Sequence, residues 1–283
     1  MTRVAVVGAN GMLGSDLVAA LPDATGFTRA ELDVTDREAA LVVLRGFDVI
    51  VNCTAWNRVD DAQTQEADAF AVNADGPEHL ANAARMTGAR LIHVSTDYVF
   101  DGTATQPYPE DAPRHPVSAY GRSKAAGEER AVAANPNATA IVRTAWLYGA
   151  NGPSFPKTML QLAGARETVA VVTDQVGQPT WTVDLAEQIV RLIGAGVPAG
   201  IFHGTNAGAV TWFGFAREVF RLAGLDPERV LPTDSAAFVR PAPRPAFSVL
   251  GHEAWASVGI PPMRRWEDAL AAAFAAGVFE PAG

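Results

Sequence analysis

A tyrosine and a lysine four residues apart, Tyr120 and Lys124, are the residues whose spacing most directly suggests chemistry. The segment from Tyr120 through Arg130 is typical of a helix, and this spacing places both side chains on one helical face. A neighbouring ammonium favours the phenolate, so we expect the pKa of Tyr120 to lie below its ordinary value of about 10. Tyr120 could then donate a proton to a substrate near neutral pH. Taken alone, the motif is a weak signal, and an ordinary pair on a helix surface is the alternative.

A glycine-rich turn near the N-terminus predicts a nucleotide-binding site. Val4–Val7 is a short apolar run typical of a strand buried on both faces, and an apolar helix follows the turn to about Leu21. In such a strand–turn–helix unit, Gly8 permits the tight turn, Gly11 the approach of a pyrophosphate, and Gly14 the packing of the helix. The helix N-terminus supplies N–H donors for phosphates. The spacing here is G-x-x-G-x-x-G, and a purely structural turn is the alternative.

The end of the second predicted strand bears on the choice of cofactor. This strand lies near residues 24–28 and ends at Arg29. In dinucleotide-binding folds an acid at this position binds the ribose 2′-hydroxyl, whereas an arginine accommodates a 2′-phosphate. Arg29 therefore favours NADPH, and NADH stays possible because no acid is expected to repel the phosphate; a solvated loop arginine is the alternative. Asp33 and Val34, which precede a predicted capping box over residues 35–38, are expected beside the adenine.

Strands and helices alternate through the first half of the chain, which predicts an α/β fold with a Rossmann-like doubly wound parallel sheet. Further strands are expected over residues 48–52, 90–95 and 138–143, with a helix over 66–86 that is adjusted near Gly76-Pro77. Residues 1–150 are predicted to form the NAD(P)-binding domain, which also receives about 181–205.

The regular alternation of strands and helices ends after Tyr148-Gly149, and residues 151–283 are predicted to form mainly a smaller, interleaved substrate-binding lobe. The segment from Leu231 to Ser248 is rich in proline and arginine and shows little periodicity. The elements expected here are helices over 154–165, 183–193, 213–223 and 266–275, and strands over 169–172 and 200–203.

Composition excludes several classes of protein. The 283 residues carry a net charge of −9 with no basic stripe, which argues against nucleic-acid binding. A single cysteine, Cys53, excludes a disulfide framework, and no apolar run reaches the ~18 residues of a membrane span. The N-terminus enters a strand after Arg3 without the apolar stretch of a signal peptide, so we expect a cytoplasmic protein. Paired Cys and His spacings of a zinc site are absent, and no metal is expected.

Taken together, the motifs resemble the extended short-chain dehydrogenase/reductase superfamily, and within it the dTDP-4-dehydrorhamnose reductase family, nearly from end to end. Two stretches are specific to that family: S-T-D-Y-V-F-D-G over residues 95–102 and D-Q-x-G-x-P-T over residues 174–180. The glycine turn and Y-x-x-x-K mark only the superfamily. The stretch R-T-A-W-L-Y-G over residues 143–149 extends the resemblance.

The resemblance implies a reduction by NAD(P)H of the C4 ketone of dTDP-4-dehydro-β-L-rhamnose to dTDP-L-rhamnose. Tyr120 would protonate the oxygen, Lys124 would hold the nicotinamide ribose, and Thr96 would donate a hydrogen bond to the carbonyl. A backbone-capping Thr96 and a core Trp146 are the alternatives. The catalytic residues expected are Tyr120, Lys124 and Thr96, and the substrate contacts are Thr96, Asp97, Tyr120 and Trp146. The cofactor contacts expected are Gly8, Asn10, Gly11, Met12, Leu13, Arg29, Asp33, Val34, Thr54, Ala55, Trp56, Tyr120 and Lys124.

Two other functions stay open. A nucleotide-sugar dehydratase on this scaffold carries Thr-Asp-Glu, but the third residue here is Tyr98, and an epimerase usually shows an acid where Arg29 stands. A non-catalytic NAD(P)-binding regulatory subunit would be marked by loss of the tyrosine or the lysine, and both are present. Residues 53–63 depart from the family pattern near the expected nicotinamide and sugar, so a different 4-keto-deoxysugar stays an alternative substrate. Some members hold magnesium at a dimer interface through an acid that Ser15 replaces here, so we expect a monomer or homodimer without metal.

Overall fold

A six-stranded parallel sheet forms the centre of the structure, a computed structural model that describes residues 2–280. The strands lie in the order β10-β5-β4-β3-β1-β2, and every neighbouring pair is parallel. Their bounds are β1 Val4–Val7, β2 Thr25–Phe27, β3 Val49–Asn52, β4 Arg90–Thr96, β5 Thr139–Thr144 and β10 Gly200–His203. The chain order reverses between β1 and β3, and ligands of such sheets bind at that point, beyond the carboxyl ends of the strands. The predicted fold class is confirmed.

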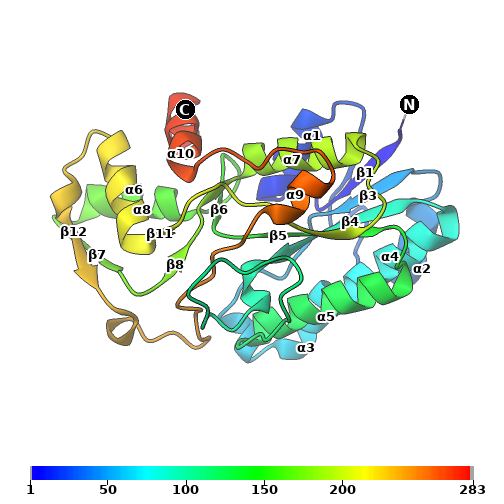
Figure 1. Cartoon of the computed structure of the whole chain (residues 1–283), viewed down its shortest axis with the longest axis horizontal. Helices are drawn as coiled ribbons and strands as arrows, with labels where there is room; N and C mark the ends of the chain where they lie inside the picture. Colours follow the sequence, from blue (N-terminus) through cyan, green and yellow to red (C-terminus); the bar gives the residue numbers. More distant parts are fainter. Residues whose placement is uncertain (1, 281–283) are drawn as a thin grey trace.

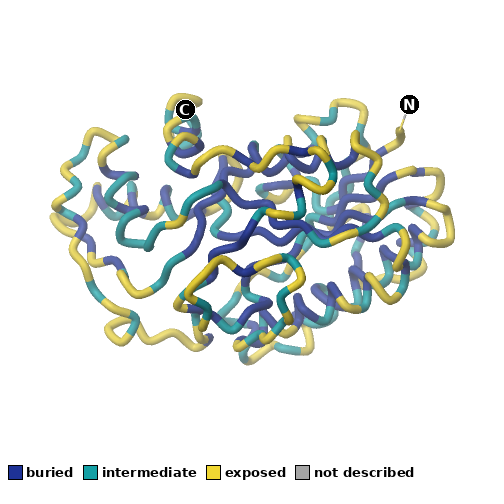
Figure 2. The backbone as a smooth tube through the Cα atoms, viewed as in Figure 1, coloured by how far each residue is buried: buried dark blue, intermediate teal, exposed yellow. Residues whose placement is uncertain are grey.

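Helices cover both faces of the sheet (Figure 1). On one face lie α1 (Met12–Ala20) and α7 (Thr182–Gly194), and on the other lie α2 (Arg37–Val43), α4 (Gly76–Thr87) and α5 (Ala119–Ala134). Figure 2 shows the strands between them as the buried centre of the molecule, as expected for apolar strands covered on both sides.

A smaller lobe lies beside the sheet, at the left of Figure 1. It contains three helices and three short strand pairs around its own apolar cluster, to which Phe215 and Trp266 contribute. The helices are α6 (Phe155–Ala165), α8 (Trp212–Leu222) and α10 (Trp266–Ala275). The pairs are β7 (Val169–Val172) with β12 (Val230–Thr233), β8 (Val176–Gly177) with β11 (Val210–Thr211), and β6 (Leu147–Tyr148) with β9 (Thr180–Trp181).

The two parts interleave. Strand β10 pairs with β5, and helix α7 packs on α1, although both elements follow much of the smaller lobe in sequence. Trp255 of the short helix α9 (Glu253–Ser257) packs on Phe202 with ring centroids 4.8 Å apart. The assignment of one part to the cofactor and the other to the substrate stays a prediction.

Three local expectations differ from the structure. The cap of α2 is Asp36, whose carboxylate accepts from Glu38 N and Ala39 N, whereas the Thr35 hydroxyl donates to Asp33; the capping box predicted over 35–38 is therefore wrong by one residue. The helix expected over 66–86 is interrupted by a π-helical turn over 71–75, just before the Gly76-Pro77 pair that suggested an adjustment. The segment from Leu231 to Ser248, in which the sequence shows little periodicity, includes most of strand β12. This strand is held by its parallel partner β7, which lies far away in sequence, so a local pattern does not reveal it.

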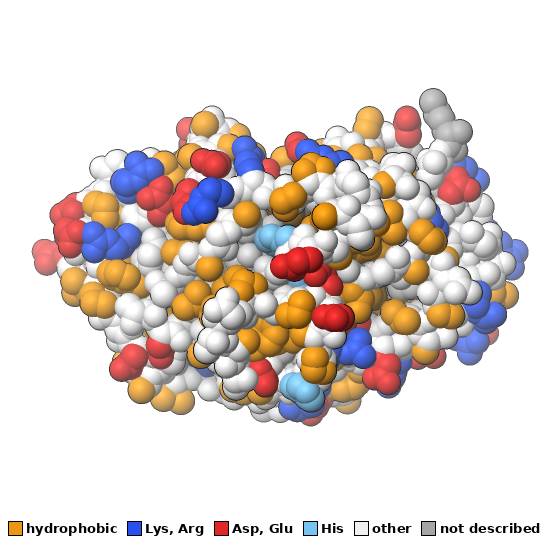
Figure 3. All heavy atoms as spheres, viewed as in Figure 1, with side chains coloured by type: hydrophobic (Ala, Val, Ile, Leu, Met, Phe, Trp, Pro, Cys, Tyr) orange, Lys and Arg blue, Asp and Glu red, His pale blue; other side chains and the backbone are white. Residues whose placement is uncertain are grey.

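The surface carries both signs of charge. On the face drawn in Figure 3, acidic and basic side chains are interspersed with hydrophobic ones. Within the described part of the chain, every helix is too short or too polar to span a lipid bilayer.

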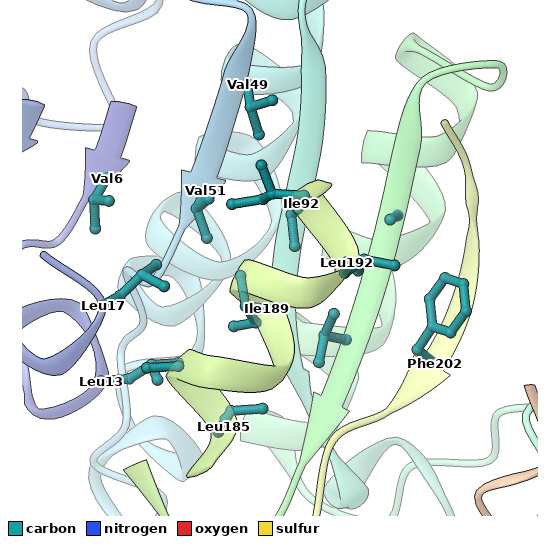
Figure 4. Close-up of a cluster of buried hydrophobic side chains, with 14 of the residues drawn as sticks. Val6, Leu13, Leu17, Val49, Val51, Ile92, Leu185, Ile189, Leu192 and Phe202 are labelled. Atoms are coloured by element: carbon teal, nitrogen blue, oxygen red, sulfur yellow. The ribbon is translucent and has the colours of Figure 1, made fainter. Parts of the chain in front are cut away.

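The core beneath the first glycine turn is apolar and closely packed. Figure 4 shows Val6, Val51 and Ile92 of the sheet facing Leu17 of α1 and Ile189 of α7. None of these five side chains is more than 2% exposed. Full burial of one such side chain is worth about 1.5–3 kcal/mol, so this cluster fixes the glycine turn and the carboxyl ends of β1, β3 and β4 against each other.

Candidate active site

A cleft of about 750 Å³ opens at the carboxyl edge of the sheet and extends to the smaller lobe. All sixteen predicted site residues line it: Gly8, Asn10, Gly11, Met12, Leu13, Arg29, Asp33, Val34, Thr54, Ala55, Trp56, Thr96, Asp97, Tyr120, Lys124 and Trp146. The structure therefore brings together residues from six separate segments of the chain. Their individual roles in catalysis and binding stay predictions.

The glycine turn forms one end of the cleft. Gly8 has a φ of +88°, which side chains other than glycine rarely adopt, and a Cβ on Gly14 would lie 2.1 Å from the carbonyl oxygen of Gly8. The turn and helix α1 therefore approach each other as closely as the glycine motif predicted. Gly11 caps α1 without a side-chain hydrogen bond, which leaves backbone N–H groups of the first turn available to a phosphate. This cradle fits a dinucleotide.

The Arg29 side chain is 82% exposed at the rim of the cleft near the glycine turn, and acidic side chains lie beside it. Arg29 Nε lies 3.3 Å from Asp33 Oδ2, and the other Asp33 oxygen accepts from the backbone N–H and hydroxyl of Thr35. Glu31 accepts from the backbone N–H and hydroxyl of Thr28. These hydrogen bonds lower the pKa of both carboxyls, so both are charged at neutral pH. The expectation that no acid lies beside Arg29 is wrong, and the rim offers a cation together with acceptors for ribose hydroxyls.

Tyr120 is placed by the first turn of α5. Ser118 caps this helix by accepting from Gly121 N at 3.0 Å. Gln63, in the stretch 53–63, accepts from Ala119 N at 2.6 Å. Both residues thus support the helix that carries Tyr120, whose ring packs against that of Tyr98 in a T-shaped pair with centroids 5.5 Å apart.

The charge state of Tyr120 differs from the sequence expectation. Burial raises the pKa of Tyr120 to about 12, and the neighbouring Thr96 side chain acts in the opposite direction. Lys124 is not among the groups that shift it, so the predicted lowering by Lys124 is wrong for the site as described. A phenol with this pKa keeps its proton across the neutral range, so the proton is present, but the phenol is a weaker acid than the lowered pKa would have made it.

The Lys124 ammonium points into the protein rather than along the helix surface. Lys124 is 2% exposed, and its Nζ donates to Val94 O at 2.7 Å. Burial lowers the pKa of Lys124 to about 8, and the Glu128 carboxylate opposes this shift. Lys124 can therefore change charge close to physiological pH.

Thr96 and Asp97 end β4 between the two parts of the molecule. The Thr96 hydroxyl donates to Asp97 Oδ1 at 2.9 Å and also accepts from Tyr98 N, so the capping role considered as an alternative is present beside a place in the cleft wall. Burial raises the pKa of Asp97 to about 6, although the Ser248 hydroxyl opposes it. Within residues 2–280, Asp97 Oδ2 has no hydrogen-bond partner of ordinary geometry. A buried oxygen of this kind fits a hydroxyl-bearing ligand.

The loop after β3 is held by Asn73, which the sequence reasoning did not assign to the site. Asn73 Oδ1 accepts from Trp56 N at 2.8 Å, and Asn73 Nδ2 donates to Trp56 O and to Ser123 Oγ, both at 3.0 Å. Asn73 therefore ties this loop to α5 beside Lys124. In the sequence Asn73 stands in an otherwise apolar run, Ala71-Val72-Asn73-Ala74, and that lone polar residue was the available signal.

Trp146 forms the wall on the side of the smaller lobe, together with Trp212. The rings stack with centroids 3.5 Å apart and an interplanar angle of 10°. Trp146 has a φ of +46°, and a Cβ on Gly177 would lie 2.5 Å from its ring. The specific D-Q-x-G-x-P-T stretch thus contributes the glycine that lets Trp146 take this position. Trp212 begins helix α8, and the sequence analysis did not assign it to the site.

The arrangement is suited to protonating an oxygen beside a bound dinucleotide. The Tyr120 phenol and the Thr96 hydroxyl lie in the wall of the same cleft as the glycine turn. Within the described residues, no three His, Cys, Asp or Glu side chains gather as a metal site would require; that no metal is bound stays a prediction.

Comparison with known proteins places these features in a family. Residues 2–278 match the family model described as the RmlD substrate binding domain. The chain is 49% identical to dTDP-4-keto-6-deoxy-D-glucose reductase of Streptomyces niveus, with 96% of each chain covered. It is 48% identical to dTDP-4-dehydrorhamnose reductase of Streptomyces griseus over 97% of this chain and 93% of that one.

A solved structure is similar over the whole fold. The dTDP-4-dehydrorhamnose reductase of Bacillus anthracis, in complex with NADP, has a TM-score of 0.94 and 37% sequence identity. The match covers 98% of this chain and 100% of that one.

Proposed function

Because the chain belongs to the dTDP-4-dehydrorhamnose reductase family, we propose that it reduces the C4 ketone of dTDP-4-dehydro-β-L-rhamnose to dTDP-L-rhamnose, with NADPH as the reductant. One observation within the chain supports this function most strongly. The Tyr120 phenol and the Thr96 side chain both lie in the wall of a cleft that begins at a dinucleotide-type glycine turn. A ketone oxygen held there would meet the Tyr120 phenol, and the Thr96 hydroxyl once it turns away from Asp97 Oδ1.

NADPH, when bound, supplies the hydride. Tyr120 then gives its phenolic proton to the C4 oxygen, and Thr96 holds that oxygen while negative charge develops. Lys124 binds the nicotinamide ribose, and Asp97 and Trp146 contact the sugar. Asp97 Oδ2, buried and without an ordinary partner in the described residues, supports the sugar contact.

The main alternative is the same reaction on a different 4-keto sugar. The Streptomyces niveus relative, at 49% identity, is named for a different 4-keto sugar. Dehydration is disfavoured because Tyr98, rather than an acid, follows Asp97 in the cleft wall. A non-catalytic role is disfavoured because Tyr120 and Lys124 both line the cleft. A cytoplasmic location and a monomeric or dimeric state stay predictions.

The proposed function is tested by following NADPH oxidation with dTDP-4-dehydro-rhamnose and, in parallel, with dTDP-4-keto-6-deoxy-D-glucose. We expect turnover with the first sugar and a product reduced at C4. Turnover with only the second sugar would keep the reaction class and change the substrate. Because a reductase releases its oxidised cofactor, the purified protein should hold little nucleotide; one equivalent of tightly bound NAD, with no NADPH consumption, would rule out the proposal.

Arg29→Ala is expected to weaken NADPH binding and to leave NADH binding nearly unchanged. A charge-assisted hydrogen bond is worth about 1–3 kcal/mol. We expect the lower end of this range, because Arg29 is 82% exposed and already pairs with Asp33. The dissociation constants of both cofactors, measured by fluorescence titration, check it. The matched control is Arg37→Ala, which removes an exposed arginine of α2 outside the cleft wall. An equal loss for NADH and NADPH would show that Arg29 does not contact the 2′-phosphate.

A further inference from the structure

A buried chain of hydrogen bonds leads from the loop after β3 to Lys124 through a histidine that has no role in the proposed reaction. Thr54 binds Asn52, Asn52 binds His93, and His93 contacts Lys124. Asn52 and His93 are directly opposite each other in β3 and β4, and both are fully buried. A polar side chain in the centre of an apolar sheet is costly unless its hydrogen bonds are satisfied, so the direction of each bond matters.

The orientation of the Asn52 amide is fixed by Thr54. Asn52 Oδ1 accepts from the backbone N–H of Thr54 at 3.0 Å and from its hydroxyl at 2.7 Å. A flipped amide would direct an NH₂ group at a backbone N–H that can only donate. Asn52 Nδ2 is therefore the group that faces His93 Nδ1 at 3.1 Å, and because it can only donate, His93 Nδ1 accepts.

This bond determines the tautomer of His93. Burial lowers the pKa of His93 well below its ordinary value, and the Lys124 charge acts in the same direction, so the imidazole is neutral. A neutral imidazole carries one proton, and since Nδ1 accepts, the proton lies on Nε2. His93 Nε2 is 3.5 Å from Lys124 Nζ. The lysine therefore faces an N–H group rather than an acceptor.

The other charged and titratable groups around Lys124 leave the preference for its uncharged form in place. Burial raises the pKa of the Cys53 thiol to about 12 and that of Tyr120 likewise to about 12, so both are uncharged near neutral pH. Glu128, one turn further along α5, favours the ammonium form. Its carboxylate, however, is already engaged by Arg143, Arg114 and Ser95.

We propose that His93 is a positioning residue that directs its Nε2–H at the Lys124 nitrogen and so favours the uncharged amine in the cofactor-free protein. The amine lone pair accepts from His93, while a hydrogen of Nζ goes to Val94 O at 2.7 Å, which holds the nitrogen at one point beneath the cleft. What this means for catalysis rests on the proposed function. The cofactor carries negative phosphates, so its binding would favour the charged form of Lys124, which takes up a proton near neutral pH. The sequence gives no hint of it, because Asn52 and His93 are 41 residues apart.

The first test reads the tautomer in the wild-type protein without cofactor. Long-range ¹H–¹⁵N spectra of histidine-labelled protein distinguish the protonated ring nitrogen, and the five histidines can be assigned by substituting the other four one at a time. We expect His93 to be neutral with its proton on Nε2 throughout the stable pH range. A proton on Nδ1, or a doubly protonated ring near neutral pH, would overturn the proposal without any variant of the network.

The second test reads the charge of Lys124 directly. The chain has only two lysines, so protein labelled with ¹³Cε-lysine gives one signal for Lys124 and one for Lys157, which is an internal control on the surface. Asn52→Ala leaves His93 Nδ1 without its donor, so that the ring can place its proton on Nδ1 and accept from Lys124 through Nε2. We expect the pKa of Lys124 to rise by about one unit in this variant, while Lys157 is unchanged.

Thr54→Val is the matched control for the second test. It removes one hydrogen bond to Asn52 Oδ1 but keeps the backbone N–H that fixes the amide, so the His93 tautomer and the Lys124 titration should stay as in wild type. If Asn52→Ala and Thr54→Val leave Lys124 titrating at the same pH, the network does not set its charge. These spectra are recorded without cofactor or sugar, so they are unaffected if the proposed substrate is wrong, which the turnover assay alone would reveal.

Discussion

Tyr120→Phe is expected to lower kcat by about 10²–10⁴, the usual contribution of general acid catalysis, while NADPH binding changes little. The substitution removes the phenolic proton and keeps the ring that packs edge-on against Tyr98. Because burial raises the pKa of Tyr120 to about 12, the wild-type phenol is protonated over the whole working range. Single-turnover kinetics with saturating NADPH separate the chemical step from binding and check the expectation.

Tyr148→Phe is the control for the loss of a buried phenolic hydroxyl. Tyr148 is fully buried in the smaller lobe outside the cleft wall, and its hydroxyl has no hydrogen-bond partner among the described residues. We expect turnover of this variant to stay near that of wild type. Near-normal turnover of Tyr120→Phe would instead move the proton donor to another group.

Arg143→Met is expected to destabilise the protein by about 3–5 kcal/mol, because it leaves a buried carboxylate without its main partner. Arg143 and Glu128 are 1% and 0% exposed, and two nitrogens of Arg143 donate to the carboxylate at 2.8 and 2.9 Å. Arg114, at 3.2 Å and 31% exposed, retains part of the compensation. Urea unfolding followed by circular dichroism gives the free energy of unfolding.

Two further variants identify the cause. The double variant Arg143→Met/Glu128→Leu should recover much of the lost stability, since it leaves no buried charge. Arg217→Met breaks an exposed pair with Glu228 and should cost no more than about 1 kcal/mol. If Arg143→Met lowers the free energy of unfolding as little as Arg217→Met does, the buried pair does not stabilise the protein as expected.

The same pair gives the sign of one pH dependence. Burial acts to raise the pKa of Glu128, but the hydrogen bonds and charge of Arg143 outweigh it, and the folded-state pKa lies below the ordinary value. The stabilisation is therefore complete at neutral pH and is lost as the pH falls through the folded-state pKa. Since Glu128 follows Lys124 by one helical turn, loss of this pair would also move the part of α5 that carries the site.

The sequence by itself determined the elements whose signals are local. The bounds of Val169–Val172, Gly200–His203 and Trp266–Ala275 agree with the predicted ranges, because apolar runs and helical periodicity are properties of a short window. The glycine turn, the Y-x-x-x-K pair and the end of β4 were recognised for the same reason. Parallel strands place their carboxyl ends at one edge, and the structure brings these motifs into one cleft there.

The tertiary structure alone decided which groups touch and what charge they carry. Folding brings Asn52 into contact with His93, which is 41 positions away in sequence. Trp212, on a helix of the smaller lobe, stacks on Trp146. The pKa of Tyr120 rises where the spacing predicted a fall, because burial depends on everything packed around the phenol. Arg29 acquires Asp33 as a partner through the conformation of the loop after β2. Periodicity reports only what neighbours along the chain can do, whereas hydrogen-bond direction, desolvation and charge pairing depend on distances that folding sets.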